Sequence, residues 1–128
     1  MKRSSIFLLF LCVLSGLRSM AQNGQRDSIS MATYVAKGTQ ETNFMRDSLG
    51  LTEVQVTGVD SVNKTFLKNV AMLQGQSFSL AERKQKILEY EATRNINLQG
   101  ILTEQQYLKY RELLTAQENR MKARLQTQ

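Results

Sequence analysis

The sequence contains no histidine, proline or tryptophan, and it has a single cysteine in 128 residues. Imidazole is the usual general base and the commonest metal ligand, so its absence disfavours nucleophile–base relays, zinc hydrolases and haem sites. We therefore expect no enzyme, no catalytic residue, no metal site and no cofactor. The length fits one domain, and 41% hydrophobic with 22% charged residues is an ordinary globular composition.

The first 21 residues have the layout of a secretory signal peptide. Lys2 and Arg3 precede an apolar run over residues 6–14, and the small residues Ser19 and Ala21 suit a cleavage site. The run has nine residues, about half of the ~20 that a membrane-spanning helix needs, which disfavours a permanent anchor. We predict cleavage after Ala21 and a mature chain without a membrane span.

Attachment to a membrane as a lipoprotein through Cys12 is also disfavoured. Leu11 stands where a small residue should precede a lipidated cysteine. Cleavage after residue 21 removes Cys12, so the mature chain cannot form a disulfide. Packing and helix capping must then stabilise the fold.

The formal net charge of +6 suggests a nucleic-acid partner until the position of the basic residues is considered. Three of the 17 basic residues lie within the predicted signal peptide, at Lys2, Arg3 and Arg18. The mature chain keeps 14 basic residues against 11 acidic ones, a net charge of +3. We therefore expect no nucleic-acid partner.

The mature chain begins with a polar segment. Residues 22–38 are mostly small and polar, which predicts a flexible leader, with a weak helix as the alternative. The apolar spacing of residues 39–49 fits a short amphipathic helix, and Gly50 would end it in the left-handed conformation. The helical domain is thus predicted over residues 39–128.

The pattern Leu-Thr-x-x-Gln occurs twice, with the copies 51 residues apart. The copies consist of Leu51, Thr52 and Gln55, and of Leu102, Thr103 and Gln106. In each copy the Thr hydroxyl can accept from the backbone N–H three residues on, while the Gln side chain reaches back to the Thr N–H. This reciprocal arrangement is a capping box. A third box pairs Ser79 with Glu82, although Arg83 stands where a hydrophobic staple would need an apolar residue.

These helix starts predict three long helices, over residues 53–74, 80–99 and 104–125, each about 30 Å long. Each carries apolar residues every three or four positions. The stripes are Val59, Val62, Phe66, Val70 and Leu73; Leu80, Ile87, Leu88, Ala92 and Ile96; and Tyr107, Tyr110, Leu114, Met121 and Leu125. Matched lengths favour antiparallel, side-by-side packing around one seam. The fold class is therefore all-α, with a short first helix followed by three long ones.

A strand is the alternative over residues 54–62, where several residues are β-branched and Gly58 interrupts a helix. Strict alternation holds only for Val54 and Val56, whereas the helical spacing continues to Leu73. We therefore predict a helix, in which Gly58 marks a bend or a close approach by another helix.

An exported, cysteine-free helical chain with two Leu-Thr-x-x-Gln motifs resembles the Spy/CpxP-like family of periplasmic proteins. The resemblance covers about residues 39–125, and residues 101–110 are its most typical part. It implies a cradle-shaped, four-helix subunit that forms an antiparallel homodimer in the periplasm. It also implies an ATP-independent chaperone, or holdase, that binds unfolded or aggregation-prone proteins. The alternatives are a CpxP-like regulator that docks on an envelope-stress sensor kinase, and an inert structural module.

The motif residues carried over from the family have a structural role, because they cap helices. Charge clustering alone suggests client-binding residues, for which a merely solvated face is the alternative. These candidates are Arg83, Lys84 and Lys86. Some relatives bind metals through histidines, which this chain lacks. Val62, Phe66 and Val70 are the positions at which we expect the dimer interface.

Overall fold

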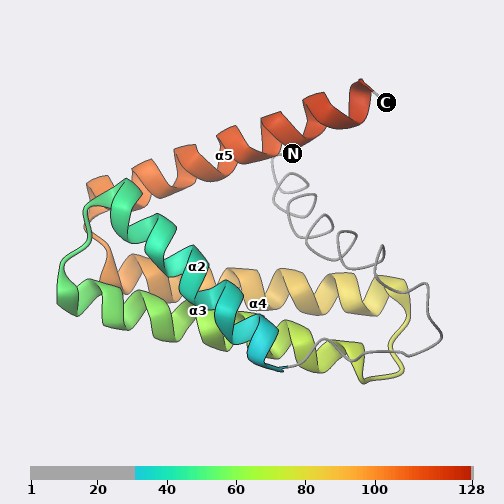
Figure 1. Ribbon diagram of the computed structural model, residues 1–128. Helices are drawn as coiled ribbons and strands as arrows, with labels where there is room; N and C mark the ends of the chain where they lie inside the picture. Colours follow the sequence, from blue (N-terminus) through green and yellow to red (C-terminus); the bar gives the residue numbers. More distant parts are fainter. Residues whose placement is uncertain (1–30, 128) are drawn as a thin grey trace. The chain divides into compact units, whose positions relative to one another are not determined.

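The structure, a computed structural model, describes residues 31–127, which fall into two compact units. Residues 31–107 contain α2 (Met31–Leu49), α3 (Glu53–Gln74), α4 (Leu80–Ile101) and the first turn of α5 (Glu104–Gln126). Residues 108–127 contain the rest of α5 (Figure 1). The described residues include no strand, so this part of the chain is all-α as predicted. The predicted signal peptide and residues 22–30 lie outside the described residues.

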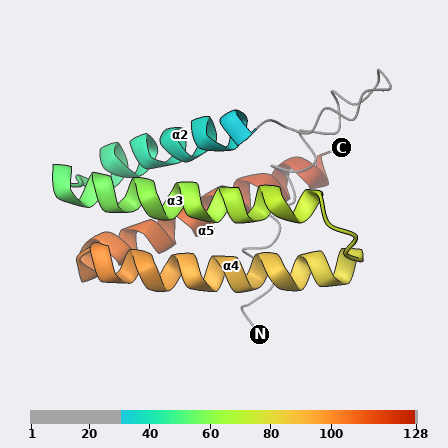
Figure 2. The ribbon, with the colours of Figure 1, turned by 90° about the horizontal axis from the view of Figure 1, so that it is seen from below.

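In the first unit, α3 lies between α2 and α4, and neighbouring helices run in opposite directions (Figure 2). Because α3 contacts a helix on each side, it supplies more core residues than any other helix. Its buried residues are Val59, Asn63, Phe66, Leu67, Val70 and Leu73. Four of the five residues in the stripe predicted for this helix are therefore buried, and Val62 is half-buried.

The three long helices have nearly the predicted bounds. The bounds of α3 coincide with the prediction, α4 ends at Ile101 rather than at residue 99, and α5 ends one residue later than predicted. Residues 54–62 are helical, so the strand alternative is wrong. A Cβ atom added at Gly58 would lie 3.0 Å from the Cδ1 atom of Ile101. Gly58 thus permits a close approach by the end of α4.

The first helix starts earlier than predicted. α2 begins at Met31 instead of residue 39, so residues 31–38 are helical, as in the weak-helix alternative, and do not form a flexible leader. The buried residues of α2 keep a helical spacing; they are Tyr34, Gly38, Thr42, Met45 and Leu49. Two of these positions hold Gly and Thr, so a search for apolar residues alone does not find them. A Cβ added at Gly38 would lie 2.8 Å from the Cγ of Lys64, so glycine allows α2 to approach α3 closely.

Gly50 ends α2 in the left-handed conformation predicted for it, with φ at +64°. The N–H groups of Gly50 and Leu51 both donate to the carbonyl oxygen of Arg46, at 3.0 and 3.2 Å. The chain therefore reverses within a short turn before α3 begins.

The apolar stripe predicted for α4 is wrong over much of its length. Leu80 is 80% exposed and Ile96 is 68% exposed, whereas Ile87 and Leu98 are buried. The predicted stripe advances in four-residue steps from residue 88 to residue 96, and each step turns about 40° past a full helical turn. The stripe therefore rotates away from α3, and Arg94 takes the contact position between the two buried residues.

The apolar stripe predicted for α5 is partly confirmed: Tyr110 is buried, while Tyr107, Leu114 and Met121 are half-buried and Leu125 is exposed.

The dimer interface expected on α3 is wrong for two of its three positions. Phe66 and Val70 are 3% and 1% exposed within the chain itself, so they belong to its own core.

Candidate functional site

The two Leu-Thr-x-x-Gln motifs each form a capping box. In the first copy, the Gln55 N–H donates to the Thr52 hydroxyl at 3.3 Å, and the Thr52 N–H donates to Gln55 Oε1 at 3.0 Å. In the second copy, the equivalent bonds between Gln106 and Thr103 measure 3.2 and 3.0 Å. Both helix starts thus have their orphan N–H groups satisfied by the same residue types.

The structure also brings the two motifs together through their glutamines. Gln55 Nε2 donates to Gln106 Oε1 at 2.7 Å, and Gln106 Nε2 donates to Gln55 Oε1 at 3.2 Å. Each amide also reaches the turn before the other motif: Gln55 donates to the carbonyl of Ile101 at 3.2 Å. Gln106 in turn donates to the carbonyl of Leu49 at 3.4 Å. We call this arrangement the glutamine pair.

The glutamine pair uses the full hydrogen-bonding capacity of two side-chain amides. Each Oε1 accepts two bonds and each Nε2 donates at least two. The pair therefore caps two helices and holds the α2–α3 turn against the α4–α5 turn, although the motifs lie 51 residues apart. The sequence predicts each cap from local spacing, but the bond between the motifs depends on tertiary placement.

Among residues 31–127, the third box has no such link to another motif. The Ser79 N–H donates to Glu82 Oε2 at 2.7 Å, and the Glu82 N–H donates to Ser79 Oγ at 3.2 Å. Hydrogen bonds from the backbone and the side chain of Ser79 lower the pKa of the Glu82 carboxyl. This box caps α4 alone and provides a natural comparison for the other two.

The three basic residues suggested for client binding lie in the first two turns of α4. Arg83 Nη2 donates to the carbonyl of Gln76 at 3.3 Å, so this side chain braces the turn before α4. Lys86 Nζ lies 3.8 Å from a carboxylate oxygen of Glu89. Both residues thus have local structural contacts, and a role in client binding stays a prediction for Arg83, Lys84 and Lys86.

A buried polar cluster, missed by the sequence analysis, joins α2, α3 and α4. Asn63 is fully buried, and its Nδ2 donates to Thr42 Oγ1 at 3.1 Å. Its Oδ1 accepts from Arg94 Nε and Nη2 at 3.1 and 2.9 Å. Because an unpaired amide in the core would be costly, these bonds favour one register of the three helices.

Arg94 completes this cluster at the surface. Its Nη2 donates to Glu41 Oε2 at 2.8 Å, and its guanidinium carbon lies 4.9 Å from the centre of the Phe66 ring. The Arg94 side chain is only 12% exposed, so its position is fixed from several sides. The sequence offers one signal for this cluster, which is a polar residue at position 63 within an otherwise apolar helical stripe.

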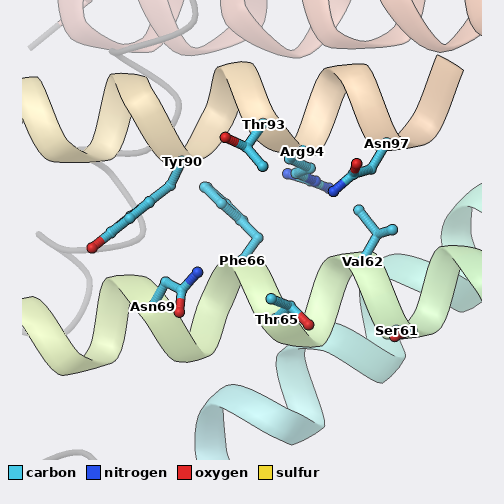
Figure 3. Close-up of a pocket in the computed structure, with 9 residues that line it drawn as sticks. All are labelled: Ser61, Val62, Thr65, Phe66, Asn69, Tyr90, Thr93, Arg94 and Asn97. Atoms are coloured by element: carbon cyan, nitrogen blue, oxygen red, sulfur yellow. The ribbon is translucent and has the colours of Figure 1, made fainter. Parts of the chain in front are cut away.

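A pocket of about 170 Å³ lies beside this cluster, between α3 and α4 (Figure 3). Phe66 is buried at its floor, whereas Thr65, Thr93 and Asn97 are exposed at its rim. Among the described residues that line it, Arg94 carries the only charge. The pocket therefore combines an aromatic floor with hydroxyl, amide and guanidinium groups.

Glu91 is the titratable group with the largest resolved perturbation among the described residues. Burial raises the pKa of its carboxyl to about 7, although the positive charge of Arg94 acts in the opposite direction. Glu91 is not among the residues that line the pocket. Ionisation of Glu91 therefore opposes folding, because burial favours the protonated carboxyl.

The described part of the chain exposes many large apolar side chains, at 43% or more of their surface. They are Met31, Val35, Phe44, Val54, Met72, Leu80, Ile96, Leu108 and Leu125. Such residues are normal when scattered singly on a surface, and these are distributed over all four helices.

Within residues 31–127, no group of three or more potential ligand side chains is placed to hold a metal ion. None of the helices in this range is long and apolar enough to cross a membrane. The chain matches no protein-family description, no curated protein and no solved structure.

Proposed function

We propose that the mature chain is a periplasmic, ATP-independent chaperone of the Spy/CpxP-like kind, which binds unfolded or aggregation-prone proteins. The observation that carries this proposal is the glutamine pair. Gln55 and Gln106 occupy equivalent places in two copies of the motif, and each bonds to the other. The two copies of the motif thus have the same structural role, which is to cap a helix and to bind the other copy. This shared role supports the resemblance to the Spy/CpxP-like family.

The exposed apolar side chains support the same function. In the first unit, Phe44, Met72 and Ile96 are 45%, 52% and 68% exposed and lie on three different helices. An unfolded client can bury its own apolar groups against these side chains, and this binding needs no chemical step. Methionine suits this purpose because its flexible thioether adapts to many shapes.

We also propose that the subunit forms a homodimer. The exposed apolar side chains supply surface for an interface, and small chains without disulfides commonly gain stability by association. Sedimentation of the mature protein at tens of micromolar tests this assignment. A dimer is expected, and a monomer would contradict it.

Light scattering by a chemically denatured client, diluted with and without the mature protein, tests the chaperone function. We expect scattering to fall at near-stoichiometric ratios, for unrelated clients and without ATP. A CpxP-like regulator would instead bind one sensor domain and leave bulk aggregation unchanged. An inert protein of equal concentration controls for crowding.

A further inference from the structure

The face of α4 that contacts α3 carries two charged residues between two apolar ones. The residues of this face follow one another in steps of four, three and four, which keeps them within an arc of about 60° around the helix. They are Ile87, Glu91, Arg94 and Leu98. Ile87 and Leu98 are buried, and the Arg94 guanidinium lies over the Phe66 ring of α3. A carboxyl group, that of Glu91, therefore lies in the seam between two packed helices.

Glu91 lies on the side of this seam that faces α2. The pocket between α3 and α4 opens on the other side, where Asn97 is turned about 120° away from Glu91 around α4 (Figure 3). Asn63, through which α3 bonds to α2, also lies outside the pocket lining. Arg94 lies between the two sides, and its Nη2 donates to Glu41 of α2 at 2.8 Å. Glu91 is thus part of the junction of α2, α3 and α4.

This junction holds two carboxyl groups but one guanidinium. Glu41 is paired with Arg94, whereas Glu91 forms no hydrogen bond or ion pair within residues 31–127. Glu91 is half-buried, and burial raises the pKa of its carboxyl to about 7. Arg94 is the one charged side chain among the described residues that acts on this pKa, and it acts from one turn further along the same helix. The same cation therefore lies within reach of a carboxylate on α2 and of another on α4.

The other titratable groups of the neighbouring helices do not supply a second positive charge to Glu91. On α3, Lys64 is paired with Asp60. On α2, Tyr34 is neutral, because burial raises the pKa of its hydroxyl, and Lys37 forms no ion pair within residues 31–127. Neither lysine acts on the pKa of Glu91. Ionisation of Glu91 thus leaves net negative charge in a half-buried junction, which is unfavourable while Glu41 stays in place.

We propose that Arg94 switches between two carboxylate partners. While Glu91 is neutral, Arg94 pairs with Glu41 and holds α2 against α4. When Glu91 loses its proton to solvent, Arg94 pairs with Glu91 on its own helix, Glu41 is released to water, and α2 separates from the junction. This regulatory device does not depend on the proposed chaperone function.

The direction of the pH response follows from the two pKa values of Glu91. Its carboxyl has a pKa of about 7 with α2 in place, against an ordinary value of 4.5, so the closed state binds the proton more tightly. Opening of α2 therefore becomes more frequent as the pH rises across this window, and it levels off above pH 7. For one proton the change is at most about tenfold per pH unit, and we expect at least about tenfold in total between about pH 5 and pH 8.

Hydrogen exchange of the full mature protein, corrected for the intrinsic effect of pH on exchange, measures this opening. The amides of Thr42 and Met45 on α2 should lose at least about tenfold in protection over that range, whereas those of Leu67 and Val70 on α3 should keep theirs. Glu91→Gln should keep α2 at its low-pH protection throughout. Protection of α2 that does not change with pH overturns the proposal, as does an equal loss on α3, which would mean destabilisation of the whole unit.

Two further variants separate the exchange of partners from the burial of Glu91 alone. Glu41→Gln removes the competing carboxylate, so α2 should be less protected at low pH and its response to pH should fall below about twofold. Glu89→Gln neutralises an exposed carboxylate on the same helix and should keep the full response. If Glu41→Gln also keeps the full response, burial of Glu91 is sufficient to explain it and the switch is wrong.

An NMR titration of the wild type tests the switch without any substitution. The guanidinium signals of Arg94 should move with the same midpoint as the carboxyl carbon signal of Glu91, because one event changes both groups. This measurement decides the matter if circular dichroism shows that Glu41→Gln fails to fold. Arg94 signals that stay constant while Glu91 titrates would overturn the proposal.

Discussion

Gln55 and Gln106 contribute more to the stability of the fold than ordinary cap residues. Each forms hydrogen bonds with the other motif, or with the turn before it, as well as with its own helix start. Replacing either by alanine should lower the free energy of unfolding by about 1–3 kcal/mol. The double variant should cost less than the sum, with a coupling of about 0.5–3 kcal/mol, because the first substitution already breaks the shared bonds. Urea unfolding of the four proteins measures this coupling.

The Ser79–Glu82 box supplies the control, since its bonds are confined to one helix start. Glu82→Ala should destabilise the chain less than either glutamine substitution and should show no coupling to Gln55→Ala. Additive effects for Gln55 and Gln106 would mean that the bonds between the motifs contribute nothing to stability.

The carboxyl of Glu91 should make stability depend on pH. Its pKa is 4.5 in an unfolded chain and about 7 in the folded one, so the folded state binds more protons between these values. Stability therefore falls as the pH rises across this window and stays low above it. Glu91→Gln should match the wild type below pH 4.5 and exceed it above pH 7, by about 1–2 kcal/mol after allowance for solvent screening. A difference between the two proteins that is the same at every pH would contradict this account.

At the scale of elements, the glycines that precede the two motifs are not equivalent. Gly50 has φ at +64°, whereas Gly100 lies inside α4 with no atom within 4 Å of an added Cβ. Gly50→Ala should therefore cost about 1–2 kcal/mol, and Gly100→Ala should gain up to about 1 kcal/mol. Thermal unfolding of the two variants decides the matter, and shifts of the same sign would contradict the distinction.

The sequence predicts an element well when the residues that define it are close together in the chain, as a cap and an apolar stripe are. The bounds of α3 follow from Thr52, which caps it, and from its regular apolar stripe. The start of α2 could not be predicted in this way, because Gly38 and Thr42 are buried by close approach and hydrogen bonding rather than by hydrophobicity. The exposed side of α4 was missed because a four-residue apolar spacing drifts around a helix.

The candidate site was predicted only in its local parts. The Thr-x-x-Gln spacing predicts both caps, but the bond between Gln55 and Gln106 joins residues that only the folded chain brings together. The same applies to the pocket between α3 and α4, because Phe66 and Arg94, which both line it, come from different helices. Non-local pairings of this kind leave no periodic signal in a single sequence.

At the scale of the whole molecule, the central claim is that clients bind to apolar side chains that the fold leaves exposed. A variant that combines Phe44→Gln, Met72→Gln and Ile96→Gln removes three of them from α2, α3 and α4. A control variant with Asn43→Gln, Thr57→Gln and Gln85→Ala changes three exposed polar residues on the same helices. Circular dichroism should show that both variants remain folded, because none of the changed side chains belongs to the core.

The decisive measurement is the ratio of protein to denatured client that halves light scattering, determined for the wild type and for both variants. The account predicts a ratio near one for the wild type and the control, and a ratio at least about tenfold higher for the apolar-to-glutamine variant. A wild type that leaves scattering unchanged, or an apolar-to-glutamine variant that protects as well as the wild type, would contradict it.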